Sequence, residues 1–126
     1  MSEIISTDRA PGAIGPYSQG MKSGKMVFTS GQLGINPETG ELDKSDIKVE
    51  TKQSLENLKA VIEAGGASLE DIVKTTVFIK NMDDFAIINE VYSEYFSDNK
   101  PARSCVEVAR LPKDANVEIE AIAILK

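Results

Sequence analysis

The sequence predicts an α+β fold in which two helices cover one face of a mixed β-sheet. Three observations carry this prediction. The expected elements follow the order ββαβαββ, two segments have apolar residues at helical spacing, and the last strand is apolar on both faces toward its end. A chain of 126 residues buries one core but not a second of ordinary size, so we expect one domain over residues 1–126.

The first part of the chain predicts a β-hairpin. Two candidate strands, 17–21 and 25–30, flank Ser23-Gly24, and a turn pair between two short apolar runs is typical of a hairpin. The sequence Asn-Pro-Glu-Thr-Gly at 36–40 indicates a second turn. The chain therefore turns again before its first helix.

Two segments predict amphipathic helices. The first covers about 47–64 and is followed by Gly65-Gly66, a common helix stop. Its apolar stripe consists of Leu55, Leu58, Val61 and Ile62. Asp83 or Asp84 can cap the second helix, and Pro101 prevents it from continuing. The stripe of this second helix consists of Phe85, Ile88, Tyr92, Tyr95 and Phe96.

Three further segments, 71–80, 103–109 and 117–125, predict strands around the second helix. In the last strand one side is apolar throughout, and on the other side Ile122 and Ile124 follow two glutamates. Two helices cover only one face of the sheet, which would leave the second apolar face exposed in a monomer. We therefore expect an obligate homo-oligomer, with subunit interfaces as natural places for a site.

The composition excludes several kinds of site. There is no histidine and only one cysteine, so zinc centres, Ser-His-Asp triads and Cys-His pairs lack the residues they need. The glycine-rich loops that cradle nucleotides do not occur either. We expect neither a metal nor a cofactor.

The charge pattern and the lengths of the apolar segments indicate which binding partners and which cellular compartment to expect. The net charge is −6 without a basic cluster, which disfavours nucleic-acid binding. No span reaches the apolar length that a bilayer requires, and the N-terminus does not resemble a secretory signal. With a single cysteine the chain suits a reducing compartment, so we expect a cytoplasmic protein.

The segment 101–108 contains two candidate site residues. Strand alternation puts Arg103, Cys105 and Glu107 on one face. Arg103 is either a solvated edge charge or a bidentate ligand for a carboxylate, a geometry that suits a planar guanidinium. Cys105 is either a small buried apolar residue or a nucleophile, although no histidine exists to activate it.

Glu118 and Glu120 share one face of the last strand, about 7 Å apart. They are either its solvated face or an acid–base pair, and the isoleucines that continue this face favour burial of at least one. Tyr17 follows a Gly-Pro turn that fixes its direction, and it is either a site residue or a packing residue. The Ser30-Gly31 pair ends a strand, where it either offers a hydroxyl and a backbone N–H to an anion or only makes a turn. Spacing alone leaves all of these residues unassigned.

Four motifs occur together and in order: I-G-P-Y-S-Q at 14–19, S-G-Q at 30–32, P-A-R-S-C-V-E-V at 101–108 and E-I-E-A at 118–121. Over essentially its whole length the chain resembles the Rid family, also called YjgF/YER057c/UK114, and within it the RidA-type deaminases. The resemblance implies a chorismate-mutase-like fold assembled as a homotrimer, whose sheets form a central barrel and whose sites lie between subunits.

The implied reaction is hydrolysis of 2-imino acids, such as 2-iminopropanoate and 2-iminobutanoate, to 2-keto acids and ammonia, without a cofactor. The family pattern assigns Arg103 to the substrate carboxylate and Glu118 to the attacking water. The other residues that it implies in the site are Tyr17, Ser30, the Gly31 backbone, Asn89 and Cys105. The connection 97–100 is shorter than in many relatives, which leaves the preferred imino acid open.

Two other functions remain open at this stage. Relatives have also been described as endoribonucleases and translation inhibitors, which would make this an RNA enzyme. The third possibility is a regulatory trimer that binds a metabolite without turning it over.

Overall fold

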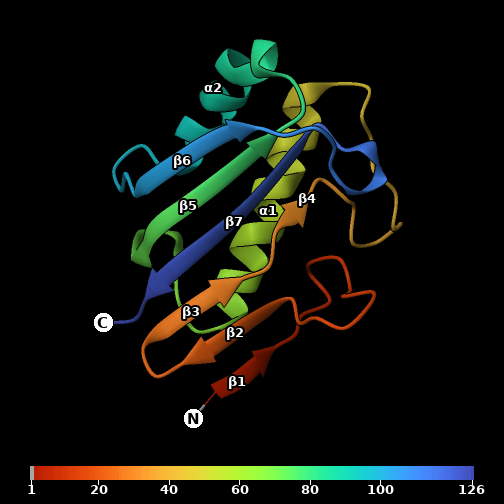
Figure 1. Cartoon of the computed structure of the whole chain (residues 1–126). Coiled ribbons are helices and arrows are strands. Elements are labelled where there is room, and N and C mark those ends of the chain that lie inside the picture. The colour runs from red at the N-terminus through yellow and green to blue at the C-terminus, as the bar shows by residue number, and fades with distance from the viewer. Residues whose placement is uncertain (1) are drawn as a thin grey trace.

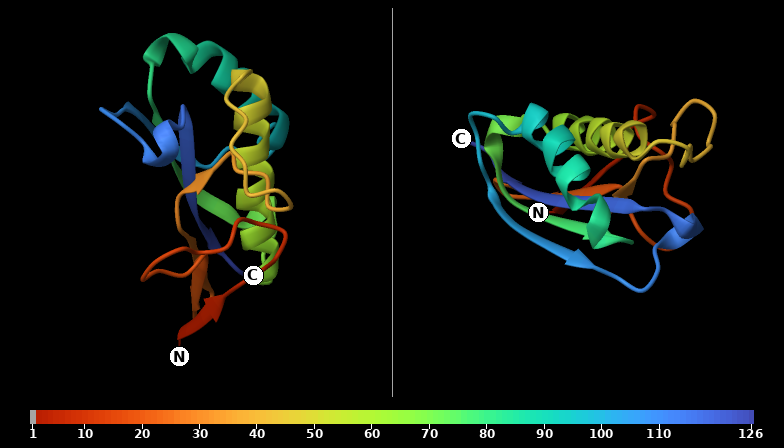
Figure 2. Two further views of the ribbon diagram at one scale, coloured as in Figure 1. Left: turned by 90° about the vertical axis from the view of Figure 1, so that its right-hand side faces the viewer. Right: turned by 90° about the horizontal axis from the view of Figure 1, so that it is seen from above.

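Two helices lie on one face of a seven-stranded mixed sheet in the computed structural model, which describes residues 2–126 (Figures 1 and 2). The helices are α1 (Ile47–Ala64) and α2 (Phe85–Tyr95). The strands are β1 (Ser2–Ile5), β2 (Gly20–Ser23), β3 (Met26–Thr29), β4 (Gln32–Leu33), β5 (Ile72–Ile79), β6 (Ala102–Glu107) and β7 (Val117–Ile124). The predicted α+β class, with both helices on one face, is confirmed.

The strands follow the order β1-β2-β3-β7-β5-β6, and the short β4 also pairs with β7. Only β5 and β6 are parallel, because α2 carries the chain back between them, whereas the other neighbours pair antiparallel. The last strand of the chain thus lies in the middle of the sheet (Figure 1). Both edges of β7 are therefore hydrogen-bonded to neighbouring strands.

The first helix has the predicted bounds, and the second begins directly after Asp84 and ends before Pro101, as expected. The side chain of Asp46 accepts a hydrogen bond from the Lys48 N–H and starts α1, which ends at Ala64 as expected. The cap predicted for α2 is wrong, because Asp84 makes no capping bond with its side chain. Instead, Asn81 caps a short 3₁₀ turn that leads into α2, and its side chain accepts from the Asp83 N–H. Neither helix is long and apolar enough to cross a membrane within residues 2–126.

The predicted strand order misses two short strands. The observed order is ββββαβαββ, because β1 pairs with β2 and the two-residue β4 pairs with β7. The strand predicted to begin at position 17 begins only at Gly20. The Tyr17 N–H instead bonds the Gly15 carbonyl in a tight turn, and the Gln19 side chain ties this loop to the 7–11 segment through hydrogen bonds.

The core lies between the helices and the sheet. In β7 the residues that face the helices are buried: Val117, Ile119, Ala121 and Ala123. Neither helix covers the opposite face of the sheet, which we call the open face (Figure 2). Alternation places on it Met26, Phe28, Phe78, Val106, Ile122 and Ile124, of which Met26, Val106 and Ile124 are exposed.

Thr51 lies in α1 with its hydroxyl buried and without a hydrogen-bond partner among residues 2–126. Replacing Thr51 by valine removes this unsatisfied group and is expected to raise the free energy of unfolding by about 1 kcal/mol. Urea unfolding at fixed protein concentration measures the change. The matched control is Ser54→Ala, which removes a bonded hydroxyl of the same helix and is expected to lower the same free energy. A less stable Thr51→Val protein would contradict the prediction.

Candidate active site

A cavity of about 630 Å³ opens between the 11–19 loop, the segment 30–37 and the beginning of β7. Four of the predicted site residues line it: Tyr17, Ser30, Gly31 and Glu118. Its walls are otherwise largely apolar and include Ile14, Leu33, Ile35 and Pro112. We call this the Glu118 cavity. It combines a small number of polar groups with an apolar lining, as small-molecule sites do.

Backbone and side-chain hydrogen bonds hold the wall around Ser30. The Ser30 hydroxyl donates to the Ser18 carbonyl at 2.6 Å, and the Ser30 N–H donates to the Gln19 carbonyl at 2.9 Å. The hydroxyl proton is therefore committed to the protein, so its oxygen meets the cavity as an acceptor. These two bonds also fix the 17–19 loop, and with it Tyr17, against the start of β4.

Position 31 has no room for a side chain unless the Glu118 carboxyl group moves. A Cβ on Gly31 would lie 2.6 Å from the carboxyl carbon of Glu118 and 2.6 Å from one of its oxygens. Real Cβ atoms do not come that close, so the backbone and the carboxylate touch only because the side chain is absent. The Gly31 backbone and the Glu118 carboxylate thus lie in direct contact in the cavity.

The environment of Glu118 favours its protonated form more than water does. Burial is the main cause of a raised pKa at this carboxyl, and the like charge of Glu120 on the same face raises the pKa further. A half-buried carboxylate with a raised pKa is a stronger base than an exposed one. This is the arrangement expected of a group that takes a proton from water.

Replacing Gly31 by alanine is expected to displace the Glu118 carboxylate and to lower turnover of the candidate substrates at least about tenfold, because a small misplacement of a reacting group is costly. The fold is expected to persist. Steady-state kinetics and circular dichroism of the same sample measure the two effects. The control is Gly12→Ala at the cavity rim, where an added Cβ meets nothing within 4 Å. Equal activity of both variants would contradict the close fit.

Arg103 begins β6 and extends toward α2, on the helix-covered side of the sheet. Its Nη1 donates to Oδ1 of Asn89 at 2.7 Å, and the guanidinium carbon lies 4.8 Å from the ring centroid of Tyr92 and 5.6 Å from that of Phe85. Tyr92 is anchored in turn by a 2.8 Å bond between its hydroxyl and that of Thr75. We call Arg103, Asn89, Phe85 and Tyr92 the Arg103 cluster.

The two aromatic rings and the amide oxygen, all from α2, orient the guanidinium without neutralising it. Among residues 2–126 the side chain of Arg103 makes no ion pair, so its positive charge and remaining N–H groups are available to an anion. A planar guanidinium held in this way suits bidentate capture of a carboxylate. Arg103 is thus an exposed, oriented guanidinium on β6, the edge strand of the sheet.

Cys105 lies two residues beyond Arg103 on the same face of β6 and is partly buried against the core. Burial raises the pKa of its thiol more than the charge of Arg103 lowers it. The neutral thiol is therefore favoured, and the interpretation of Cys105 as a lining residue fits this environment better than a nucleophile.

The structure separates the predicted residues into two groups on opposite faces of the sheet. Arg103 is level with Thr75 and Ala121 across the strands and faces the helices, whereas Glu118 faces the open side. The first group, in the Glu118 cavity, is Tyr17, Ser30, Gly31 and Glu118, and the second is Asn89, Arg103 and Cys105. One chain alone does not join Arg103 to Glu118.

Sequence reasoning missed the rings that flank Arg103. The sequence places Phe85 and Tyr92 only in the apolar stripe of the second helix. Together with Asn89 they lie at i, i+4 and i+7, and this single line along α2 faces the guanidinium. An amide within an aromatic stripe was the signal that could have found this group.

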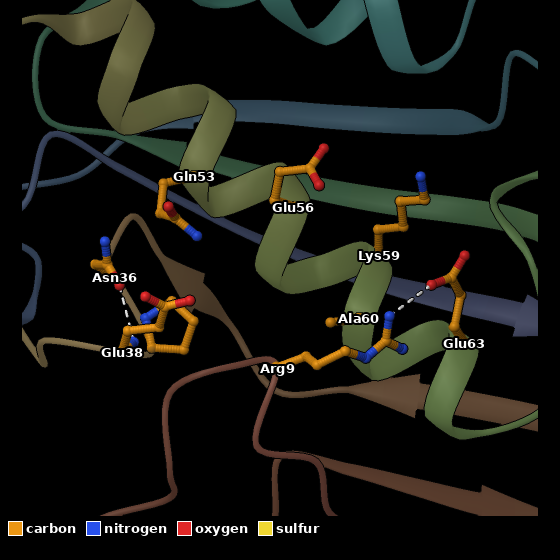
Figure 3. A pocket seen from close by; sticks show the side chains of 9 residues that line it. Arg9, Asn36, Glu38, Gln53, Glu56, Lys59, Ala60 and Glu63 are labelled. Atoms are coloured by element: carbon orange, nitrogen blue, oxygen red, sulfur yellow. Dashed lines mark hydrogen bonds and ion pairs between the residues drawn. The ribbon is translucent and has the colours of Figure 1, made fainter.

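A second, more polar cavity of about 400 Å³ lies along the outer side of α1 (Figure 3). An ion pair between Nη1 of Arg9 and Oε1 of Glu63, 3.3 Å apart, crosses one end of it. None of the predicted site residues lines this cavity. Its charged groups are of both signs and are exposed, as is usual for a helix surface.

Comparison with known proteins identifies relatives that align with nearly the whole chain. The family model described as endoribonuclease L-PSP matches residues 7–125. The 2-iminobutanoate/2-iminopropanoate deaminase of Escherichia coli is 54% identical over 98% of each chain. A RutC family protein of Pyrococcus horikoshii is 58% identical over 98% of each chain.

Solved structures give the same relationship in three dimensions. The crystal structure of Escherichia coli TdcF with bound serine has a TM-score of 0.95 at 55% identity and covers 98% of this chain and 99% of that one. The Escherichia coli YjgF structure also has a TM-score of 0.95, at 52% identity and with the same coverage. Sequence and fold therefore agree over the full length of the described chain, and the protein belongs to the Rid (YjgF) family.

Proposed function

We propose that the protein is a reactive intermediate deaminase, which hydrolyses 2-imino acids such as 2-iminopropanoate and 2-iminobutanoate to 2-keto acids and ammonia. The observation that carries the proposal is the Glu118 carboxylate, half-buried, of raised pKa and in contact with the Gly31 backbone inside a largely apolar cavity. The deaminase name of a 54% identical relative supports the same chemistry.

The complete site is proposed to lie between subunits of a homotrimer. Arg103 and Glu118 project from opposite faces of one sheet, so a substrate that meets both needs a second copy of the chain. The open face carries the exposed apolar residues Met26, Val106 and Ile124, and their burial would favour association. In such an assembly the Glu118 cavity receives Arg103 of the partner subunit.

In the proposed mechanism Arg103 binds the substrate carboxylate and so directs C2 of the imine toward a water held by Glu118. The water oxygen attacks C2 while Glu118 accepts a proton from it, which gives a tetrahedral carbon bearing a hydroxyl and an amine. Glu118 then returns its proton to the amine, and the C–N bond breaks as the hydroxyl loses its proton to Glu118, which releases ammonia and the 2-keto acid. Cys105 lines the site as a neutral thiol.

These steps require no group beyond the side chains named. A protonated imine is already electrophilic, and ammonia is a ready leaving group once protonated. Positioning one water and one carboxylate is therefore sufficient to accelerate the reaction. The serine bound to TdcF, a small molecule with a carboxylate, is consistent with a family site of this kind.

A pulse of imine tests the proposal directly. Serine or threonine dehydratase generates 2-iminopropanoate or 2-iminobutanoate, and the release of the keto acid is followed with and without the protein. We expect faster release with the protein and a rate proportional to its concentration. Equal rates, together with measurable binding of a small carboxylate, would favour a regulatory protein that binds the metabolite without turnover.

An RNA-cleaving activity is the second candidate, because the matching family model is described as endoribonuclease L-PSP. A net charge of −6 and the largely apolar Glu118 cavity both weigh against an RNA substrate. Incubation of the wild-type protein and the Arg103→Ala variant with RNA separates the cases. Cleavage by wild type that the variant lacks would support the RNA function, and cleavage by both would indicate a contaminant or another site.

A further inference from the structure

The buried side of α1 is polar along its first half. Glu50, Ser54 and Asn57 lie at i, i+4 and i+7 and are fully buried, where a helix packed on a sheet ordinarily places apolar residues. We call these three residues the polar stripe. Burying such groups is unfavourable unless each is hydrogen-bonded. The hydrogen-bond partners of the polar stripe therefore show which segments of the chain it holds in place.

Two members of the polar stripe hold the wall of the Glu118 cavity that contains Gly31. The Ser54 hydroxyl donates to the Gln32 carbonyl at 2.7 Å. Asn57 Nδ2 donates to the carbonyls of Leu33 and Ile35 at 2.9 and 2.8 Å. The wall at 32–35 is thus fixed by side chains of α1, in a stretch where the sheet contributes only the two-residue β4.

Glu50 holds the start of β7, which forms a second wall of the cavity through Glu118. Its Oε2 accepts from the backbone N–H of Asn116 at 2.7 Å, and its Oε1 accepts from Asn116 Nδ2 at 2.8 Å. Asn116 immediately precedes β7 and lies two residues before Glu118. Glu50 also fits closely against Gly34, where an added Cβ would overlap the backbone and side chain of Glu50. A single buried carboxylate therefore contacts both walls.

We propose that Glu50, supported by Ser54 and Asn57, is a positioning residue that sets the placement of the Glu118 carboxylate against the Gly31 backbone. This inference rests on the proposed function, because it concerns the same cavity. It explains why the stripe is polar: an apolar residue in its place would pack against the sheet but would hold neither wall at a defined distance from the other.

The test exchanges donors and acceptors without changing size. In Glu50→Gln the carboxylate becomes a neutral amide, so both hydrogen bonds to Asn116 lose their charge assistance, and the one to its side chain forms only after the Asn116 amide turns its oxygen toward the new NH₂. We expect kcat to fall roughly 10- to 100-fold, as for a slightly misplaced catalytic group, with KM little changed. Adding Asn116→Asp gives that NH₂ an acceptor, and the double variant is expected to recover most of the loss.

A second measurement does not depend on turnover. The titration of the Glu118 carboxyl, followed by carbon NMR, reports its surroundings, which include Glu120 on the same strand and Lys113 in the cavity lining. We expect the Glu118 titration to shift in Glu50→Gln and to return in the double variant. If wild type hydrolyses no imine, the proposed function fails, while the NMR titration still decides whether Glu50 positions Glu118.

Thr51→Val is the matched control, since Thr51 is buried in the same helix but its hydroxyl holds neither wall. We expect this control to leave kcat and the Glu118 titration at wild-type values. If Glu50→Gln does not fold, Ser54→Ala tests the other wall, with a loss in kcat at constant KM expected. An unshifted Glu118 titration in Glu50→Gln, or unchanged kcat in the variant that folds, would overturn the inference.

Discussion

Replacing Arg103 by alanine is expected to abolish the acceleration of keto-acid release. In the proposed site the guanidinium makes two charge-assisted hydrogen bonds to the substrate carboxylate, each of about 1.5–3 kcal/mol. Loss of both corresponds to a decrease in kcat/KM of roughly 10²- to 10⁴-fold. Steady-state kinetics over a pulse of imine measures it.

Arg103→Lys is the matched variant for this prediction. Lysine keeps the positive charge but lacks the planar pair of donors that a carboxylate requires, and it stacks less well on Tyr92. We expect intermediate activity and, for both variants, the oligomeric state of the wild type by light scattering. Full activity of the alanine variant would remove Arg103 from the substrate site.

Replacing Glu118 by glutamine is expected to lower kcat by roughly 10²- to 10⁴-fold, with KM little changed. Glutamine has the same shape but cannot accept a proton from water. The substrate carboxylate remains bound because its anchor is a different residue. Kinetics of Glu118→Gln at saturating imine measure the effect, and a KM that rises with unchanged kcat would show that Glu118 serves binding instead.

The pH dependence of the wild type gives an independent check on Glu118. The base acts in its deprotonated form, so activity is lost as the pH falls through the pKa of Glu118, which burial and Glu120 raise. Glu120→Gln removes the like charge and therefore lowers this pKa. We expect the acid limb of the kcat/KM profile to move to lower pH in that variant, and an unmoved limb would assign it to another group.

The two inactive variants also test the intersubunit site when they are combined. Arg103→Ala and Glu118→Gln chains are unfolded together, refolded as mixed oligomers and assayed. Half of the cavities then contain an intact Glu118, and half of those meet an intact Arg103, so about a quarter of wild-type activity should return. Activity that stays at the level of the separate variants would contradict a site shared by Arg103 and Glu118 of neighbouring subunits.

Local pattern was sufficient for most of the fold. The bounds of α1 and α2 follow from apolar spacing and from glycine or proline beyond their ends, signals that lie within a few residues of each other. The strands β1 and β4 have no such signal. They are short, and each is defined by its pairing with a strand elsewhere in the chain. The strand β1 pairs with β2, and β4 pairs with β7.

In the candidate site, too, some features follow from local sequence and others only from the tertiary structure. The sequence by itself determined which residues share a face of a strand, since alternation is a property of the extended backbone, and the motifs named the residue types. Only the tertiary structure decided that Arg103 and Glu118 face opposite sides of the sheet, because that depends on how β6 and β7 are ordered around β5. It likewise decided that Glu50 reaches Asn116, a contact across 66 positions that no local period encodes.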